Sequence, residues 1–335
     1  MKAVVLNKFG GPDILKVTDI PEPIPSDDEI KVKVIYAGLN WAEILSRKGF
    51  YSWAPKLPYT LGMEGVGEVV ECGKNISEVE IGDKVMIVGQ YGSYAQYITI
   101  HKDILVKKPE YLSLKEGAAF TSNFITAWVG LNEMARVRPG EIGLVHAAAG
   151  GVGTAALQLG MAMGLKMYGT ASPQKQEIVE RLGATYLSYE GFHEELNGVR
   201  PDVILESIGG DVFKRSFDVL NPMGRIVLVG ALSLKKPPLW NPFAWIKLYR
   251  DLPRVDIRNV LRRSRAFMGL HVGYLLADTE KLRTKYNEMM EVCVRHNLRP
   301  LVRDEAIFPM SKISDAHIYF EGRKSIGKVL IDPWS

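Results

Sequence analysis

Apolar and polar positions alternate along the first third of the chain. Residues 1–6 (MKAVVL) and 29–36 (EIKVKVIY) follow the two-residue period of a half-buried β-strand. A glycine-rich stretch at 62–67 precedes a further strand pattern at 68–71. Many short strands joined by glycine turns predict a twisted, barrel-like β domain up to about residue 118.

The pattern changes at about Phe120, where short apolar runs begin to alternate with helical segments. The predicted strands of this part are 142–147, 166–170, 185–189, 202–206 and 225–230. Strands that alternate with helices form a doubly wound parallel sheet. From about Phe267 the chain returns to mixed structure, and it closes with a strand at 327–331 that can rejoin the first domain. We therefore predict an α/β protein of two domains: residues 1–119 and 267–335 form a discontinuous β-rich domain, and residues 120–266 form an inserted domain with a doubly wound parallel sheet.

A strand, a glycine turn and a helix follow one another around residue 150. Leu144–Ala147 is too apolar to have a wet face, and Thr154–Met163 continues as a helix of small residues. Glycines let the backbone approach phosphate oxygens, and a helix N-terminus offers free N–H groups and the positive end of its dipole. The pattern predicts a dinucleotide site; the alternative is a tight strand-to-helix turn without a ligand. The residues of the turn are Ala149, Gly150, Gly151, Val152 and Gly153.

The end of the next strand distinguishes NAD from NADP. In a dinucleotide-binding fold, an acidic residue about 20 positions after the glycines binds the adenosine ribose of NAD. Here the strand runs into Thr170-Ala-Ser172-Pro, and the first carboxylate downstream is that of Glu177. Ser172, Lys175 and Tyr189 offer hydrogen-bond donors instead of an acceptor. These donors favour the 2′-phosphate of NADP; the alternative for Lys175 is a solvated helix charge.

Length and composition narrow the class of protein. With 335 residues the chain exceeds one ordinary domain, and 47% hydrophobic with 24% charged residues is usual for a globular protein. A net charge of +4 does not indicate nucleic acid as a partner. No apolar run is long enough to span a membrane, Met1–Leu6 enters a strand pattern rather than a signal, and Cys72 and Cys293 cannot build a disulfide framework. We expect a cytoplasmic protein.

Positive charge is concentrated at residues 235–265. Nine basic and two acidic residues give this segment a charge of +7, which leaves −3 for the rest of a chain whose total is +4. The aromatic residues interleaved with them are Trp240, Phe243, Trp245 and Tyr249. Such a segment either covers the substrate site as a helical flap or makes a peripheral contact with an anionic membrane surface. Prolines at 238, 242 and 253 interrupt a long helix and favour the flap.

The motifs taken together resemble those of the medium-chain dehydrogenase/reductases, in their zinc-independent quinone oxidoreductase branch. The motifs are 38–43 (GLNWAE), 47–51 (RKGFY), 58–67 (PYTLGMEGVG), 147–153 (AAAGGVG) and 323–329 (RKSIGKV). Residues 123–126, 169–172 and 269–274 are also similar to the group named for the synaptic-vesicle amine transport protein. The resemblance implies a GroES-like β-rich catalytic domain, an inserted Rossmann domain and a homodimer.

The same resemblance argues against a catalytic metal. Zinc-dependent members carry a cysteine where Asn40 aligns and a histidine where Met63 aligns, and the four-cysteine lobe of those members is absent. Zinc needs a nearly closed set of nitrogen or sulfur donors. The six histidines are scattered without ligand spacing, so we expect no metal. Glu64, which supports the metal site in zinc-dependent members, is then expected to be structural.

By resemblance, Asn40 and Tyr51 lie where the substrate meets the nicotinamide. Asn40 offers a donor and an acceptor, and Tyr51 offers a phenol for a carbonyl oxygen. The alternatives are a turn or cap residue for Asn40 and packing beside Trp53 for Tyr51. The other implied cofactor contacts are Thr126 at the nicotinamide or its ribose, Gly230, Met268 and Gly269 around the carboxamide, and Arg323 and Lys328 at phosphates, where either is otherwise a solvated charge.

These features favour an NADPH-dependent reductase of quinones or α,β-unsaturated carbonyls. Hydride from the nicotinamide reduces an electron-poor C=C bond, and hydrogen-bond donors or water stabilise the charge that builds on the carbonyl oxygen. Two alternatives stay open: a dedicated biosynthetic enone reductase or cyclase, and a weakly catalytic, NADP-bound lipid- or membrane-associated protein. An apolar lining for a flat or aliphatic substrate is expected from Trp41, Phe50, Trp53, Tyr91 and Tyr94.

Overall fold

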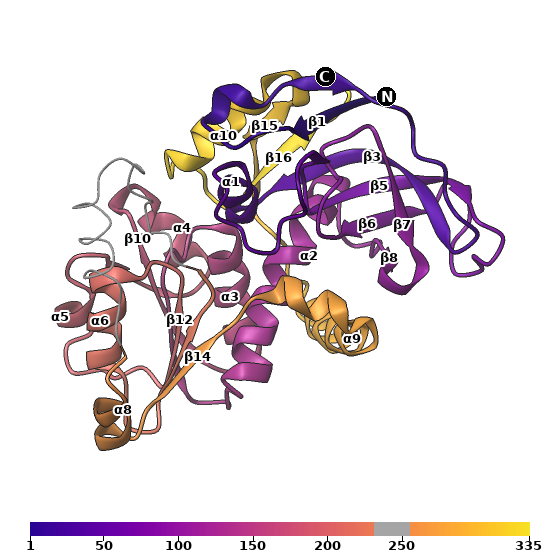
Figure 1. The fold of residues 1–335 in the computed structure, drawn as a ribbon. Helices are drawn as coiled ribbons and strands as arrows, with labels where there is room; N and C mark the ends of the chain where they lie inside the picture. The colour runs from indigo at the N-terminus through magenta and orange to yellow at the C-terminus, as the bar shows by residue number, and fades with distance from the viewer. Residues whose placement is uncertain (231–254) are drawn as a thin grey trace. The chain divides into compact units, whose positions relative to one another are not determined.

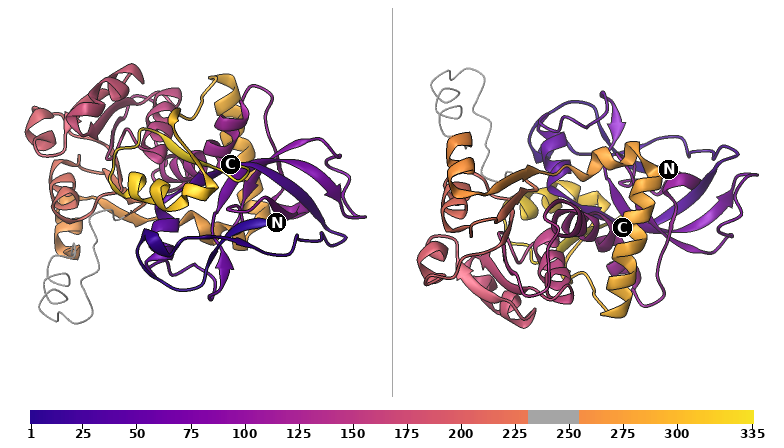
Figure 2. Two further views of the ribbon diagram at one scale, coloured as in Figure 1. Left: turned by 90° about the horizontal axis from the view of Figure 1, so that it is seen from above. Right: turned by 90° about the horizontal axis from the view of Figure 1, so that it is seen from below.

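The computed structural model describes residues 1–230 and 255–335, and the chain divides into two compact units (Figure 1). Unit 1 comprises Met1–Ile125 and Val272–Ser335, and unit 2 comprises Thr126–His271. Of the basic aromatic segment predicted at 235–265, residues 235–254 lie outside the described residues. Both termini belong to unit 1, as the two further views in Figure 2 also show.

Unit 1 is built mainly on antiparallel strands, as the alternating pattern predicts, and its one parallel pair among the described strands is β15 with β16. Its strands are β1 (Lys2–Leu6), β2 (Val17–Asp19), β3 (Glu29–Leu39), β4 (Tyr59–Thr60), β5 (Glu64–Cys72), β6 (Lys84–Val88), β7 (Tyr97–His101), β8 (Val106–Lys107), β15 (Val302–Pro309) and β16 (Lys328–Asp332). Its longer helices are α1 (Trp41–Arg47), most of α2 (Leu114–Trp128), α9 (Thr279–Arg295) and α10 (Ile313–Glu321). The larger sheet has the order β15-β16-β3-β5-β6-β8, with β7 also paired to β3.

The centre of this sheet is β3. Its sequence EIKVKVIYAGL buries Ile30, Val32 and Val34 on one side and leaves the lysines between them partly exposed. The closing strand β16 pairs antiparallel with β3, with Val329 opposite Leu39. The end of the chain therefore returns to the unit in which the chain begins, and it places Lys328 beside the carboxyl end of β3.

Unit 2 contains one six-stranded parallel sheet, which confirms the predicted doubly wound fold. Its strands are β9 (Ile142–Val145), β10 (Lys166–Ala171), β11 (Thr185–Ser188), β12 (Val203–Glu206), β13 (Arg225–Leu228) and β14 (Ala266–Gly269). Its helices are the π-helical turn η3 (Val129–Met134), α3 (Gly151–Ala162), α4 (Gln176–Arg181), α5 (Phe192–Glu195), α6 (Gly210–Val219) and α8 (Ile257–Arg263). The sheet order is β11-β10-β9-β12-β13-β14, and every neighbouring pair is parallel.

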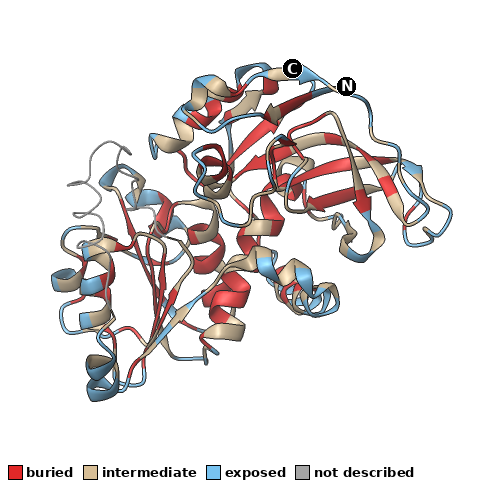
Figure 3. Ribbon diagram, in the orientation of Figure 1, coloured by how far each residue is buried: buried red, intermediate tan, exposed pale blue. Residues whose placement is uncertain are grey.

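The sixth strand was missed by the sequence analysis. Residues Ala266–Gly269 pair with β13 at the sheet edge, where alternate side chains are exposed. Figure 3 shows this contrast between the buried central strands and the more exposed edge. A four-residue edge strand carries too weak an apolar signal to be recognised. Because β14 belongs to this sheet, unit 2 ends at His271 and not at the predicted residue 266. The other boundary between the units lies within α2, after Ile125 and not after the predicted residue 119.

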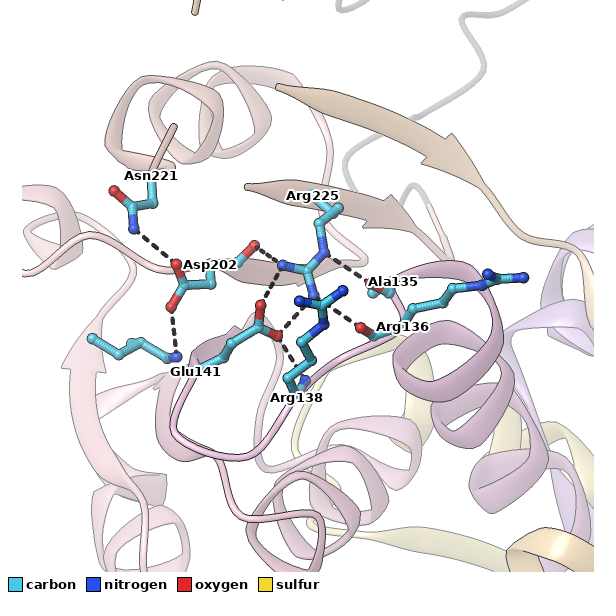
Figure 4. Close-up of polar contacts among 8 residues, drawn as sticks. Ala135, Arg136, Arg138, Glu141, Asp202, Asn221 and Arg225 are labelled. Atoms are coloured by element: carbon cyan, nitrogen blue, oxygen red, sulfur yellow. Dashed lines mark hydrogen bonds and ion pairs between the residues drawn. The ribbon is translucent and has the colours of Figure 1, made fainter. Parts of the chain in front are cut away.

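Arg225 and Asp202 form a cluster of hydrogen bonds at the amino-terminal edge of the parallel sheet (Figure 4). The Arg225 guanidinium donates to both carboxylate oxygens of Glu141 at 2.8 Å and, through Nε, to the carbonyl oxygen of Ala135 at 2.8 Å. Asp202 accepts from the backbone N–H of Ile142 at 2.9 Å and from the Asn221 amide at 2.8 Å. These contacts join β9, β12 and β13 at the end opposite the glycine turn, so they support the sheet without occupying the edge that holds the candidate site.

Candidate functional site

The glycine turn lies at the carboxyl edge of the parallel sheet, between β9 and α3. Gly150 is the N-cap of α3, and its N–H donates to the carbonyl oxygen of Ala147 at 2.9 Å. A Cβ at Gly153 would clash with that same carbonyl and would lie 2.7 Å from the Cα of Ala148. Only glycine therefore lets the first turn of α3 pack this closely on the turn. A strand, a glycine turn and a closely packed helix N-terminus are the elements that the predicted dinucleotide site requires.

Residues predicted to select NADP lie at the same edge. Strands β10 and β11 are parallel neighbours with Ala171 opposite Ser188, so Ser172 and Tyr189 follow at adjacent positions immediately beyond the strands. Ser172 begins the short helix η4 (Pro173–Lys175), whose last residue is Lys175. Ser172, Lys175 and Tyr189 are all half-buried. The topology thus gathers a hydroxyl, a phenol and a cation where the dinucleotide fold places the adenosine ribose.

Thr170 has a structural task at this edge. It is completely buried, its carbonyl oxygen accepts from the Ala148 N–H at 2.9 Å, and its hydroxyl lies 2.8 Å from Nδ1 of His146. The other ring nitrogen of His146 lies 2.7 Å from Oγ of Ser216, which donates its own proton to the carbonyl oxygen of Val212. Nε2 of His146 is therefore the donor and Nδ1 the acceptor, the arrangement of a neutral imidazole.

Burial lowers the pKa of His146 to about 3, which keeps the ring neutral. Glu206, also buried, lies 3.7 Å from Nε2 and accepts from the Gly209 N–H at 3.1 Å, and burial raises its pKa. The sequence did not predict this network, since His146 was only one of six histidines without ligand spacing. A histidine directly between a buried strand and the glycine turn was the available signal.

The predicted nicotinamide contacts fall on two strand ends. Leu228 is opposite Gly269 in the pairing of β13 with β14, so Gly269 ends β14 at the carboxyl edge and Gly230 follows two residues after its partner Leu228. Met268 is half-buried within β14. Thr126, also half-buried, lies in the last turn of α2. These four residues belong to unit 2, as does the glycine turn.

Asn40 connects β3 to α1 in unit 1. Its backbone N–H donates to Oε2 of Glu43 at 2.9 Å, so Glu43 caps the helix that Asn40 begins. The other carboxylate oxygen of Glu43 accepts from the Met63 N–H at 3.0 Å. Burial raises the pKa of Glu43 to about 7, while Lys328 opposes the shift. The expected cap position of Asn40 is therefore real.

Lys328 differs from the expectation of a phosphate contact or a solvated charge. Its side chain is buried, its ammonium forms an ion pair with Glu64, and it donates to Oδ1 of Asn40 at 2.6 Å. The register of β16, β3 and β5 brings these groups together, because Gly38 of β3 pairs with both Glu64 and Leu330. Glu64 also accepts from the Ser122 N–H at 2.9 Å. Glu64 thus has the structural position expected, with Lys328 as its partner.

Tyr51 follows α1 and lies among aromatic rings. The Trp53 ring packs edge-on against it at 6.3 Å, and the Tyr274 ring lies 6.4 Å from Trp53. Burial, with Glu43 and Tyr274 nearby, raises the pKa of the Tyr51 phenol. The phenol therefore remains protonated and suits hydrogen-bond donation better than proton transfer.

The remaining predicted residues divide between surface and core. Arg323 is exposed and adopts a left-handed conformation with φ 56° after α10. Phe50 is partly exposed, and Tyr91 is exposed and packs on Tyr59. Tyr94, expected to line the substrate site, is instead completely buried in the core of unit 1. Its position follows from backbone hydrogen bonds to Val4 and Leu61 that hold this segment inside.

Metal-ligating side chains do not cluster in the described part of the chain. Within residues 1–230 and 255–335, no three His, Cys, Asp or Glu side chains gather in a way that could hold a metal ion. Asn40 and Lys328 occupy a polar cluster with Glu64 that is already charge-paired. In the same described residues, no helix combines the length and apolar character needed to cross a bilayer.

Comparison with known proteins places the chain in a family. Residues 26–110 match the alcohol dehydrogenase GroES-like domain, and residues 151–293 match the zinc-binding dehydrogenase domain. A pig (Sus scrofa) quinone oxidoreductase is 36% identical over 99% of this chain and 97% of its own length. The synaptic vesicle membrane protein VAT-1 homolog of the rat (Rattus norvegicus) is 32% identical over 99% of this chain and 84% of its own length.

Solved structures agree with the sequence relatives. The Escherichia coli quinone oxidoreductase, determined as a complex with NADPH, superposes with a TM-score of 0.86 at 26% identity, over 99% of this chain and 100% of that chain. The protein is thus a two-domain α/β dehydrogenase in architecture. It belongs to the medium-chain dehydrogenase/reductase family, among the quinone oxidoreductase-like members.

Proposed function

We propose that this protein is an NADPH-dependent oxidoreductase that reduces a quinone or an α,β-unsaturated carbonyl without zinc. The observation that carries the proposal is the glycine turn at the carboxyl edge of the parallel sheet, where Gly153 packs against Ala147 without room for a Cβ. The E. coli relative that shares this fold was determined with NADPH bound. The polar residues beside the turn supply donors for the 2′-phosphate that distinguishes NADPH from NADH.

The residues of unit 2 bind and orient the cofactor in this proposal. The first N–H groups of α3, from Gly151 onward, receive the pyrophosphate, and the dipole of the helix favours its charge. Ser172, Lys175 and Tyr189 hold the 2′-phosphate through charge-assisted hydrogen bonds. Gly230 and Gly269 leave the backbone open beside the nicotinamide. NADPH supplies the hydride.

The residues of unit 1 bind the substrate carbonyl. Nδ2 of Asn40 and the Tyr51 phenol donate hydrogen bonds to the carbonyl oxygen, where negative charge grows during reduction. When hydride adds to the β-carbon, the C=C bond electrons move toward this oxygen, and water then protonates the α-carbon. For a quinone, both oxygens end as hydroxyls after the same two-electron reduction and the uptake of protons. The raised pKa of Tyr51 makes it a donor that stays protonated throughout.

A second candidate is a weakly catalytic, NADP-bound protein that contacts lipid. It is favoured by α8, on which Ile257 and Leu261 are 73% and 74% exposed beside Arg258, Arg262 and Arg263. A basic surface with exposed apolar side chains suits an anionic bilayer. A dedicated biosynthetic enone reductase is a narrower form of the first candidate, in which the same chemistry acts on a single substrate. Family resemblance also leads us to propose a homodimer, and from the sequence composition we propose a cytoplasmic location.

NADPH oxidation, followed by absorbance at saturating cofactor, tests the proposal. A panel of quinones, cyclic enones and alkenals is offered with NADPH and, in parallel, with NADH. We expect turnover with NADPH and at least tenfold lower kcat/KM with NADH. Tight NADPH binding without turnover of any panel member would overturn the broad reductase and favour a dedicated substrate. Salt-sensitive co-sedimentation with anionic vesicles, lost in Ile257→Ser/Leu261→Ser, would favour the lipid-contacting protein.

A further inference from the structure

A buried polar cluster in unit 1 includes the Asn40 side chain. It consists of Asn40, Glu43, Glu64 and Lys328, of which the last three are at most 2% exposed. Buried charges are expensive unless they are paired and hydrogen-bonded. Glu43 accepts two backbone N–H groups, and Glu64 accepts one together with the Lys328 ammonium. The cluster is therefore an assembled polar network.

The ammonium of Lys328 is confined from several sides. Gly38 lies against its stem, because a Cβ at Gly38 would be 2.8 Å from Cε of Lys328 and 2.8 Å from Cγ of Glu64. Glu64 itself is fixed by the Ser122 N–H at 2.9 Å. The ion pair thus occupies the space that a larger residue in β3 would fill, and Lys328 has little freedom to point elsewhere.

This confinement decides how the Asn40 carboxamide is oriented. An ammonium has three donors and no acceptor, so only Oδ1 can face it, and Oδ1 lies 2.6 Å away. The amide nitrogen Nδ2 is buried and has no hydrogen-bond partner among residues 1–230 and 255–335. An unpaired buried N–H group is costly, so it is a feature that a bound acceptor would satisfy.

We propose that Lys328 is a positioning residue that holds Asn40 as a hydrogen-bond donor. The inference rests on the proposed function. Because the oxygen of the carboxamide faces Lys328, the unpaired polar atom that Asn40 offers to a ligand is Nδ2 with its N–H groups. The group that Asn40 binds is therefore an acceptor, such as a carbonyl oxygen, and not a hydroxyl that must donate. Without Lys328, the carboxamide can rotate and present its oxygen, which would repel a carbonyl oxygen.

The two test variants are Glu64→Gln/Lys328→Met and Asn40→Asp, and they distinguish a loss of positioning from a loss of folding. Lys328→Met alone leaves Glu64 buried without its partner, which can unfold the unit. The paired variant Glu64→Gln/Lys328→Met removes both charges together and leaves Asn40 in place but free to rotate. Asn40→Asp keeps an oxygen for Lys328 and removes the donor. Lys312→Met, an exposed lysine of the same C-terminal region, is the matched control.

The expected result in the reductase assay is a loss in kcat of about tenfold or more for both test variants, with NADPH affinity within twofold of the wild type. Lys312→Met should match the wild type in both. A paired variant that folds, binds NADPH and keeps wild-type kcat would overturn the positioning role. A fall in NADPH affinity equal to the fall in kcat would also overturn it, because the effect would then be on cofactor binding.

A measurement without substrate separates this inference from the proposed function. The side-chain amide signal of Asn40, identified by its loss in Asn40→Asp, is followed by ¹⁵N NMR in the apo protein. The Lys328 contact predicts a single, slowly exchanging pair of amide protons that shifts in Glu64→Gln/Lys328→Met and stays unchanged in Lys312→Met. An unchanged Asn40 signal in the paired variant would refute the contact. If the signal shifts but the wild type reduces no substrate, the proposed function fails and the positioning of Asn40 stands.

Discussion

Nδ1 of His146 lies 2.8 Å from the hydroxyl of Thr170, and both residues are buried directly below the glycine turn. The contact joins the ends of two neighbouring parallel strands, β9 and β10. The cofactor-binding edge thus has a polar support that depends on a neutral imidazole. This support makes the stability of unit 2 sensitive to acid.

We expect His146 to make the protein less stable as pH falls. Its pKa is about 3 in the folded protein and 6.5 in an unfolded chain, so below pH 6.5 the unfolded state binds the additional proton. Between pH 7.5 and pH 5.5 this linkage removes about 1.4 kcal/mol of stability. Urea unfolding of His146→Gln should show a lower midpoint at pH 7.5 but a shallower loss toward pH 5.5. His296→Gln, at the exposed end of α9, should keep the wild-type pH dependence; an equally steep loss in His146→Gln would contradict this account.

Gly153→Ala should weaken NADPH binding. The new Cβ would clash with the Ala147 carbonyl, so the first turn of α3 must move away from the turn. Because the helix N-terminus is the proposed pyrophosphate site, we expect a rise in Kd of about tenfold or more by fluorescence titration. Gly89→Ala is the control, since a Cβ there meets only the Tyr91 carbonyl at 3.8 Å. Equal Kd values for the two variants would place the pyrophosphate elsewhere.

Lys175→Glu should lower the preference for NADPH over NADH. A carboxylate in place of the ammonium repels a 2′-phosphate and accepts from a ribose hydroxyl instead. The ratio of kcat/KM for NADPH to that for NADH should fall by about tenfold or more. Lys214→Glu, on the exposed side of α6, makes the same charge change and should leave the ratio unaltered. An unchanged ratio in Lys175→Glu would mean that Lys175 is a solvated charge.

Tyr51→Phe should reduce kcat without changing the pH profile. Loss of one donor to the developing oxyanion costs about a hundredfold to a thousandfold in rate. The raised pKa of the phenol keeps it protonated, so the wild type should show no ionisation of Tyr51 in kcat between pH 6 and pH 9. Tyr97→Phe, a tyrosine of β7 packed on Trp334, serves as the control. Full activity of Tyr51→Phe would assign the residue to packing beside Trp53.

Arg225→Met should destabilise unit 2 by about 2–4 kcal/mol, because it leaves the half-buried Glu141 carboxylate without its bidentate partner. Chemical denaturation measures this change. The matched change Arg263→Met breaks an exposed pair with Asp218 and should cost less than about 1 kcal/mol. NADPH affinity should be retained in Arg225→Met at low denaturant, because the cluster lies at the opposite edge of the sheet. Equal losses of stability in the two variants would contradict a special role for Arg225.

The sequence by itself determined the parallel sheet and the glycine turn. Both are local: a buried strand, three glycines and a small-residue helix are contiguous, and strand–helix alternation has one common solution. The same locality placed Ser172 and Tyr189 after strands whose ends meet. Position alone was predictable there, since adjacent parallel strands end at one edge.

Only the tertiary structure decided the partners of Asn40 and His146. Lys328 lies 288 positions from Asn40 in the chain, and they meet because β16 takes its register against β3. From sequence Lys328 is one more cation in a basic segment, whereas burial and the space beside Gly38 turn it toward Glu64. The strand β14 was not predicted for a related reason: a short edge strand forms through its pairing with the neighbouring strand, which its own sequence does not report. Periodicity and spacing report local geometry, while buried charge pairing depends on strand register, which distant segments set together.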